Sequence, residues 1–237
     1  MSMKILSLDA SATSASVCIY DSAEDKIIGE FFINTKLTHS QTLVPMIDAI
    51  LNSTKLQLSD INYFAVNTGP GSFTGIRIGV SVIKGMAMAL DKPCVSISTL
   101  ESMAYNFVDS SDIIVCACMD ARRNQVYNAL FNVKDGQIER LCDDRAISID
   151  ALYNELSALD KPVVLVGDGA QLCYSQKSEQ SDVTLATVSK RYQTASSVAL
   201  CAENSINNND VLSAASLMPT YLRPSQAERE RLEKEKE

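Results

Sequence analysis

The chain has 237 residues, of which 46% are hydrophobic and 21% are charged. This length and composition indicate one large or two small globular domains with a hydrophobic core, and they exclude a disordered chain. The net charge of −8 at pH 7 disfavours direct binding to a nucleic-acid backbone, because proteins that bind it normally carry a basic stripe on their surface.

The seven cysteines are scattered through mostly apolar segments, which is typical of a reduced, cytoplasmic protein. Cys116 and Cys118 are expected on one face of a strand, with no second cysteine or histidine pair nearby, so we expect buried thiols and no metal site. No long apolar run is evident, so no membrane span is expected. A strand pattern begins at Met3, which leaves no room for a signal peptide.

In the first half of the chain, β-branched and aromatic runs alternate with turns and helical spacing. Closely spaced strands at the start predict antiparallel hairpins. The expected elements are strands over 3–8, 16–20 and 27–34, a helix over 38–51, a strand over 62–67, a helix over 73–90, a strand over 94–97 and a helix through 107.

The helix expected over 73–90 is unusual in its polarity. It follows a dense turn signal, and Ser72 is placed to cap its start. Its only charged residues, Arg77 and Lys84, are seven residues apart and therefore on one face. A helix that rests on a sheet at the surface should show a wide polar face. The narrow one predicts that this helix is covered twice.

Two glycines lie within the same helix. Gly75 and Gly79 are four residues apart, and Met86 continues their face, with Val82 or Ile83 between. Each interior glycine costs about 1 kcal/mol relative to alanine, so a close approach of another backbone is expected to offset it. That backbone belongs either to this chain's own sheet or to a helix of another subunit, and the spacing alone does not separate the two.

The second half repeats the order of the first, including an Asp-Ala pair after its first strand. We therefore predict an internal duplication of a βββαβα unit, with domains over residues 1–108 and 109–224 and a charged, solvated tail over 225–237. The expected elements are strands over 113–119, 125–131 and 137–142, a helix over 149–159, a strand over 162–166, an irregular piece over 170–193 and a helix over 195–204.

Six collinear segments carry a resemblance to a known family, densely in the first half and more thinly to Arg223. They are LSLDAS (6–11), HSQTLVPMI (39–47), GPGSFTGIRIG (69–79), STLE (98–101), MDAR (119–122) and YLR (221–223). Together they resemble the TsaB (YeaZ) family, the glycoprotease-like proteins of bacterial tRNA threonylcarbamoyladenosine biosynthesis. The family belongs to the actin, sugar-kinase and heat-shock-ATPase superfamily, so the resemblance implies an α/β fold of two actin-like ATPase (ribonuclease-H-like) domains.

The resemblance also implies a non-catalytic role. A member of this family pairs with and activates its paralogue TsaD, which threonylcarbamoylates the tRNA adenosine next to the anticodon, and the small ATPase TsaE joins the pair. Such a subunit is expected to reach tRNA only through the complex and to form a homodimer when alone. The resemblance places the pairing surface on the helices over 38–51 and 73–90, and so favours the second interpretation of the glycines. The interface residues that we expect are His39, Leu43, Ile47, Gly75, Gly79, Val82, Ile83 and Met86.

The residues independently argue against catalysis. His39 is the single histidine, so neither a His-x-x-x-His metal pair nor an HExxH protease motif is possible. A Ser-His-Asp or Cys-His centre would have to be built on His39, which we expect instead to be a polar residue at a helix end. We expect no catalytic residue, no metal ligand and no cofactor-binding residue.

The alternative function is that of an ATP-binding enzyme, an ATPase or small-molecule kinase of the actin-like fold. Phosphate-binding turns use glycines so that backbone amides can surround the phosphate, but the first turn, residues 9–15, has none. Asp9 and Asp120 could hold magnesium through water or could simply cap their turns, and capping is the preferred interpretation. The sequence Gly-Asp-Gly at 167–169 fits a second phosphate loop or an ordinary turn.

Overall fold

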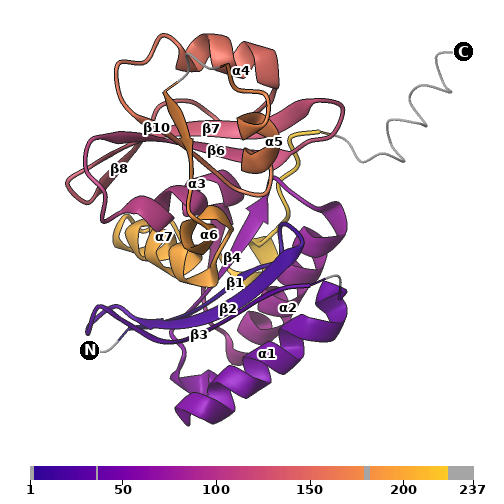
Figure 1. The fold of residues 1–237 in the computed structure, drawn as a ribbon. Coiled ribbons are helices and arrows are strands. Elements are labelled where there is room, and N and C mark those ends of the chain that lie inside the picture. The colour runs from indigo at the N-terminus through magenta and orange to yellow at the C-terminus, as the bar shows by residue number, and fades with distance from the viewer. Residues whose placement is uncertain (1–2, 36, 179–181, 224–237) are drawn as a thin grey trace, which may run out of the picture.

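The computed structural model describes residues 3–35, 37–178 and 182–223, which form two lobes (Figure 1). The charged tail expected over 225–237 lies outside the described residues.

The first half of the chain forms a five-stranded mixed sheet in the order β3-β2-β1-β4-β5. Its elements are β1 (Lys4–Asp9), β2 (Ser14–Asp21), β3 (Lys26–Asn34), α1 (His39–Thr54), η1 (Leu58–Asp60), β4 (Tyr63–Gly69), α2 (Phe73–Leu90) and β5 (Cys94–Ser98). The first three strands are antiparallel, as the closely spaced hairpins predicted, and β4 and β5 run parallel to β1. Helices α1 and α2 cover one face of this sheet (Figure 1). We call the sheet with these two helices the N-terminal lobe.

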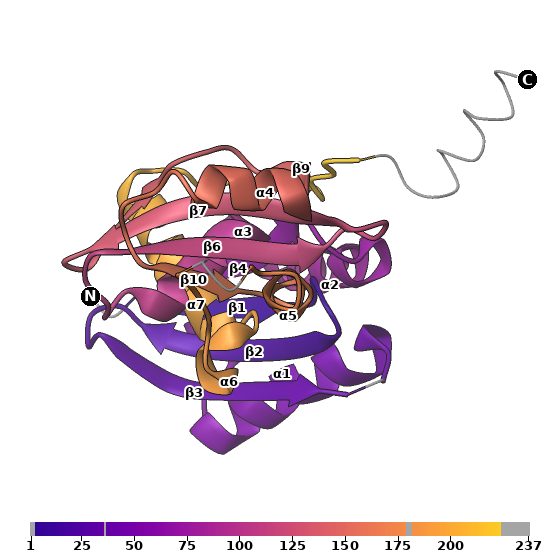
Figure 2. The ribbon, with the colours of Figure 1, turned by 45° about the horizontal axis from the view of Figure 1, so that its top comes forward.

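The second half forms a sheet in the order β11-β10-β6-β7-β8, with β9 paired to β7. Its elements are β6 (Ile113–Asp120), β7 (Gln125–Lys134), β8 (Gln137–Arg140), β9 (Arg145–Ser148), α4 (Ile149–Leu156), β10 (Val163–Val166), α5 (Ala170–Tyr174), β11 (Val183–Leu185) and α6 (Val188–Arg191). Counted from the first strand of each half, the two sheets share one strand order, so the duplicated α/β fold is confirmed. We call this sheet with α4 and α5 the C-terminal lobe (Figure 2).

The piece over 170–193 is more regular than expected. It contains α5, β11 and α6, and β11 continues the sheet by pairing in parallel with β10. The Thr184 hydroxyl also donates a hydrogen bond to the Val163 carbonyl, at 3.1 Å. A strand of three residues is too short to show an alternating pattern, which is why the sequence predicted an irregular segment.

The two halves exchange their last helices. Helix α3 (Thr99–Ala104) and the turn η2 (Tyr105–Phe107) follow β5, but Leu100 and Met103 pack in the core of the second sheet. Helix α7 (Ala195–Asn207) comes from the second half, but Val198 and Ala202 pack on the first sheet. Both helices lie between the sheets (Figure 1). The expected boundary at 108/109 therefore separates the strands of the two sheets, while each core is completed by a helix of the other half.

Candidate functional site

Helix α2 has the bounds that the sequence predicted. Its first turn is capped by Ser72, whose hydroxyl accepts a hydrogen bond from the Gly75 amide at 3.2 Å. Its inner face is buried against β1, β4 and the neighbouring α1. The buried residues of the helix are Gly75, Ile76, Gly79, Val80, Ile83 and Ala87.

The two glycines lie on this inner face. A Cβ atom at Gly75 would stand 2.0 Å from the Ala10 carbonyl oxygen and 2.9 Å from the His39 ring. A Cβ atom at Gly79 would stand 2.9 Å from Leu8 Cδ2. The glycines thus allow α2 to approach the end of β1 and the start of α1. Both glycines therefore face this chain's own sheet and not a helix of another subunit, because a backbone carbonyl fills the space at Gly75 and side chains of β1 and β4 fill it at Gly79.

Three of the expected interface residues are also buried in the chain's own core. Leu43 and Ile83 are 0% exposed and Ile47 is 4% exposed. In an amphipathic helix on a sheet, the regularly spaced apolar residues mark the inner face. The spacing therefore identified the face that packs on the sheet, so these three side chains do not form a free surface. Val82 and Met86 pack against the same core but are partly exposed.

His39 stands at the first turn of α1, where the sequence predicted a polar helix-end residue. Its Nε2 is 2.8 Å from the Ala12 carbonyl oxygen, so Nε2 carries the hydrogen and donates. The ring also packs against Gly75. His39 therefore ties α1 to the turn between β1 and β2 and to α2.

The two charged residues of α2 hold the segment 214–223, which we call the C-terminal strap. Lys84 Nζ donates to the carbonyl oxygens of Ala215 at 2.9 Å and Leu217 at 3.2 Å. Arg77 Nε donates to the Tyr221 hydroxyl at 2.6 Å. The narrow polar face of α2 led us to expect that the helix is covered on two sides, and the strap forms one of these covers. Its contacts explain why Arg77 and Lys84 are charged.

One face of α2 remains open. Gly85 is exposed, and a Cβ atom there would meet no described atom within 4 Å. Met88 is 64% exposed. The residues of this outer face, which carries no formal charge, are Thr74, Ile78, Ser81, Val82, Gly85 and Met88. The sequence interpretation missed all of them except Val82, although their spacing of three and four residues marks one helix face.

By length and composition alone, α2 is also apolar enough to cross a membrane, contrary to the expectation that no segment is. In the fold it lies along the first sheet, and its inner residues are buried there. Core helices of globular proteins share this composition, so it is weak evidence for a span.

A cavity of about 460 Å³ lies between the lobes, where the alternative function would place a nucleotide. The turn after β1 is closed by the chain itself: the Ser72 amide donates to the Ser11 carbonyl oxygen at 2.7 Å, and a Cβ atom at Gly71 would lie 2.3 Å from that same oxygen. The cavity is lined by Ser11, Ala12, Thr13, Gly71, Ser72, Phe73, Met119, Asp120, Ala121, Arg122, Tyr127 and Asp168.

Two carboxylates near this cavity, Asp9 and Asp120, accept hydrogen bonds through their Oδ1 atoms. Asp9 Oδ1 accepts hydrogen bonds from the Ser11 hydroxyl at 2.7 Å and the Asn67 amide at 2.7 Å, and burial raises the pKa of Asp9. Asp120 Oδ1 accepts from the Arg122 amide at 2.8 Å. The contacts with Ser11 and Arg122 are of the local capping kind that the sequence favoured, whereas Asn67 reaches Asp9 from β4.

The Gly-Asp-Gly segment likewise uses its backbone amides internally. The Gly167 amide donates to the Arg191 carbonyl oxygen at 2.6 Å, and the Gly169 amide donates to Cys118 at 3.0 Å. Between them, Asp168 is exposed to solvent at the edge of the cavity, where partial desolvation by the surrounding chain raises its pKa to about 6. These residues fit an ordinary turn and do not fit a phosphate loop, which needs free amides.

Comparisons with known proteins place this geometry in a family. The family model described as "TsaD: tRNA N6-adenosine threonylcarbamoyltransferase" matches residues 26–231. The tRNA threonylcarbamoyladenosine biosynthesis protein TsaB of Bacillus subtilis is 30% identical over 237 residues, which is 99% of this chain and 100% of that protein. The chain belongs to the TsaB family.

Further TsaB relatives agree. The Escherichia coli TsaB protein is 31% identical over 171 residues, covering 71% of this chain and 73% of that protein. Among solved structures, YeaZ from Pseudomonas aeruginosa has a TM-score of 0.76 at 23% identity and covers 93% of this chain and 100% of its own. A second Pseudomonas aeruginosa structure, with similarity to peptidase YeaZ, reaches a TM-score of 0.81 at 24% identity with the same coverage. These two structures share the TsaB fold described above.

Proposed function

We propose that this TsaB-family chain acts in tRNA threonylcarbamoyladenosine biosynthesis as a non-catalytic subunit that pairs with and activates TsaD. The names of its relatives support the pathway. The single histidine, bonded to a backbone carbonyl, supports the absence of a catalytic centre of its own. TsaE joins this pair, tRNA is reached only through the complex, and the site of action is the cytoplasm.

The observation that carries the pairing is the exposed Gly85 on the outer face of α2. A glycine inside a helix costs about 1 kcal/mol relative to alanine. Gly75 and Gly79 have internal reasons for being glycine, whereas Gly85 has none among the described residues. Close approach of a partner's helix to α2 supplies such a reason.

The pairing surface is therefore shifted from the one expected at first. The outer face of α2 combines the small residues Ser81 and Gly85 with the apolar Ile78 and Met88. Val44 of α1, 58% exposed, adds a further apolar contact. Two helices of the partner packed on α1 and α2 would complete a four-helix bundle, with small residues allowing the axes to approach closely. In the absence of TsaD, the same surface pairs two copies of this chain.

Activation acts through the orientation of the partner, because none of the outer-face residues of α2 is among those that line the interlobe cavity. A partner bound there would be biased toward one arrangement of its own domains without contact between this chain and the substrate. This is an allosteric effect, whose size is the coupling free energy between the two surfaces.

Replacement of Gly85 by arginine tests the pairing. In a pull-down with TsaD, Gly85→Arg should abolish binding while the circular dichroism spectrum stays that of the folded chain and the thermal stability does not fall, because the side chain projects into open space. Asn154→Arg, at an exposed position of α4, adds the same charge in the other lobe and should bind normally. Full binding by Gly85→Arg would refute this surface. TsaD activity measured with and without the chain tests the activation separately.

The ATP-binding alternative has a direct test of its own. The closed turn at Ser11 and the engaged amides at Gly167 and Gly169 leave little to hold a phosphate. Calorimetric titration with ATP and magnesium should give no binding heat. Measurable ATP turnover that is lost in Asp9→Ala would favour the enzyme.

A further inference from the structure

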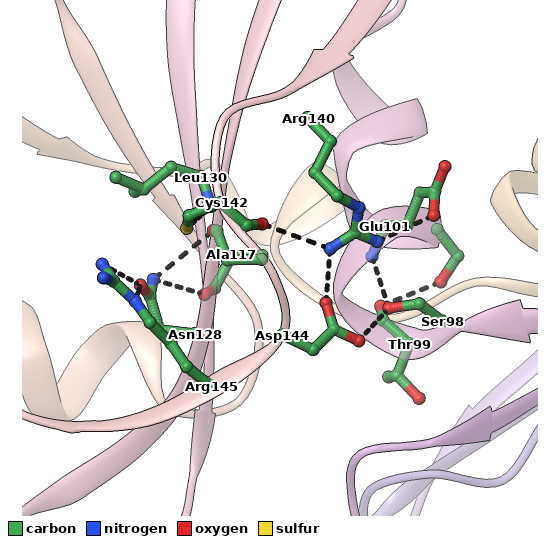
Figure 3. Close-up of polar contacts among 12 residues, drawn as sticks. Ser98, Thr99, Glu101, Ala117, Asn128, Leu130, Arg140, Cys142, Asp144 and Arg145 are labelled. Carbon is green, nitrogen blue, oxygen red and sulfur yellow. Dashed lines mark hydrogen bonds and ion pairs between the residues drawn. The ribbon is translucent and has the colours of Figure 1, made fainter. Parts of the chain in front are cut away.

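A cluster of charged side chains joins the two lobes beside α3 (Figure 3). Arg140, at the end of β8, donates to Asp144 Oδ1 at 2.5 Å and to Glu101 Oε2 at 2.8 Å. Its guanidinium also lies 4.8 Å from the centre of the Phe131 ring. The three charged side chains are 28%, 18% and 35% exposed in the order Arg140, Asp144 and Glu101, so the ion pairs are largely shielded from water.

Ser98 completes the cluster from the first sheet. Its hydroxyl donates to Asp144 Oδ2 at 2.6 Å and accepts from the Glu101 amide at 3.3 Å (Figure 3). Ser98 ends β5 and caps α3, whereas Arg140 and Asp144 belong to the C-terminal lobe. We call these four residues, Ser98, Glu101, Arg140 and Asp144, the Arg140 clasp.

Asp144 uses both of its carboxylate oxygens in the clasp. One carboxylate oxygen of Asp144 accepts from Arg140 and the other accepts from Ser98, so Asp144 bridges the two sheets. Charge-assisted hydrogen bonds in partly buried positions are stronger than neutral ones at the surface. Loss of the guanidinium would leave Glu101 and Asp144 close together without a counter-charge, which is costly in a partly desolvated site.

A second arginine in the same view provides a contrast. Arg145 donates to Asn128 Oδ1 at 3.2 Å (Figure 3). It also pairs with Glu155 of α4, and all three residues lie in the C-terminal lobe. Its side chain is 29% exposed, against 28% for Arg140. The two arginines are thus alike in burial and bonding. They differ in that Asp144, the partner of Arg140, also accepts a hydrogen bond from Ser98 of the first sheet, whereas the partners of Arg145 both lie in the C-terminal lobe.

The lobes are also tied at the C-terminal strap. The Thr220 amide donates to the Thr68 carbonyl oxygen at 2.8 Å in the N-terminal lobe, and Arg223 donates to Gln125 Oε1 at 2.7 Å in the C-terminal lobe. With the exchanged helices α3 and α7, the clasp and the strap make three kinds of attachment between the lobes. Hinge closure around a ligand requires the two lobes to rotate about a few flexible residues. Attachments at several points between the lobes oppose this rotation.

We propose that the Arg140 clasp is a lock that holds the two lobes at one fixed angle, so that the interlobe cavity does not open and close. The lock itself does not depend on the proposed pairing with TsaD. If that pairing is correct, the lock also keeps the outer face of α2 at a constant position relative to the C-terminal lobe, so that the partner meets a rigid surface.

The lock is tested by the distance between the lobes in solution. Spin labels are placed on Asn52 of α1 and Ser157 beside α4, both exposed, through non-natural residues so that the seven native cysteines are spared. Pulsed electron paramagnetic resonance then gives the distance distribution in the full chain. The unmodified clasp should give one narrow distribution, and Arg140→Met should broaden it roughly twofold or more as the lobes begin to rotate.

Arg145→Met is the matched control and should leave the distribution narrow. An unchanged distribution in Arg140→Met overturns the proposal, and so does equal broadening in Arg145→Met, which would indicate general loosening of the second sheet. If Arg140→Met does not fold, the double variant Glu101→Gln with Asp144→Asn removes the same ion pairs with little change in shape. A narrow distribution in that double variant would likewise overturn the lock. Loss of TsaD binding in Gly85→Arg bears on the pairing alone, so the two proposals fail independently.

Discussion

The ring of Tyr221 lies parallel to the ring of Phe73, with 4.5 Å between their centroids and 12° between their planes. Phe73 begins α2, and Tyr221 lies near the end of the C-terminal strap. The Arg77 guanidinium lies near both rings and donates to the Tyr221 hydroxyl. The end of the strap is thus fastened to the start of α2 by one stacked pair and one charged hydrogen bond.

Replacement of Tyr221 by alanine should therefore lower the free energy of unfolding by about 2 kcal/mol, the sum of a stacked aromatic pair and a hydrogen bond to a charged group. Tyr221→Phe keeps the stack and loses only the hydrogen bond, so its loss should be about half as large. Urea unfolding measures both changes. Equal stability of Tyr221→Ala and the unmodified chain would mean that the strap is not held by this contact.

The same substitution at two glycines of α2 should have opposite effects. Gly75→Ala places a methyl group against the Ala10 carbonyl oxygen, so it should destabilise the chain by about 1–3 kcal/mol through overpacking. Gly85→Ala meets open space and should stabilise the helix by about 1 kcal/mol. Thermal unfolding of the two variants tests which glycine faces inward. A neutral Gly75→Ala would contradict the close approach of α2 to β1.

Asp168 should make stability depend on pH in a defined direction. Partial desolvation beside the cavity raises its pKa from 3.8 to about 6, so the folded chain binds this proton more tightly than the unfolded chain does. The unfolded carboxyl loses its proton first as pH rises from 4 to 6, and the folded chain is progressively destabilised over that window. Asp168→Asn should therefore be more stable than the unmodified chain above pH 6, by up to about 1 kcal/mol once solvent screening of this exposed carboxyl is discounted, and the gain should vanish near pH 4.

Denaturant unfolding of Asp168→Asn at several pH values measures this gain. Asp160→Asn, which removes an exposed carboxylate outside the cavity, is the control for a general effect of the lost charge. A gain for Asp168→Asn that is constant from pH 4 to pH 8 would rule out a titration of Asp168 as its cause.

The exchange of helices predicts that the first domain does not fold alone. A fragment of residues 1–108 lacks α7, so Ile5, Val95 and Ile97 would lose the helix that covers them. It should show poor amide dispersion by nuclear magnetic resonance and no cooperative unfolding. Mixing it with residues 109–223 should restore both. A dispersed spectrum from the fragment alone would contradict the role given to α7.

The sequence predicted the bounds of α2 but not its orientation. A capping serine, a dense turn and helical spacing define where such a helix begins and ends. Because α2 is apolar or small on most sides, periodicity shows which residues share a face and does not show which face turns inward. That depends on the Ala10 carbonyl and His39 ring, which reach the helix from other parts of the chain. Gly75 and Gly79 were therefore assigned to the wrong side, and Gly85 was overlooked.

Contacts between distant segments were equally hidden. Arg77 and Lys84 were recognised as one polar face, but their partners in the strap are 144 and 131 residues away. Arg140 gave no signal in the sequence, since its role depends on how β8 meets α3. In contrast, the repeated strand order was predictable, because hairpins and buried strands are set by local alternation.

The position of α7 in the chain also matters while the protein is being made. About 100 residues separate the end of β5 from the start of α7, and translation proceeds at about 5–20 residues per second. For on the order of ten seconds on the ribosome, the first sheet is complete except for the helix that shields its apolar face. During that interval the nascent polypeptide is most open to aggregation, and it is then that a chaperone would have a surface to bind.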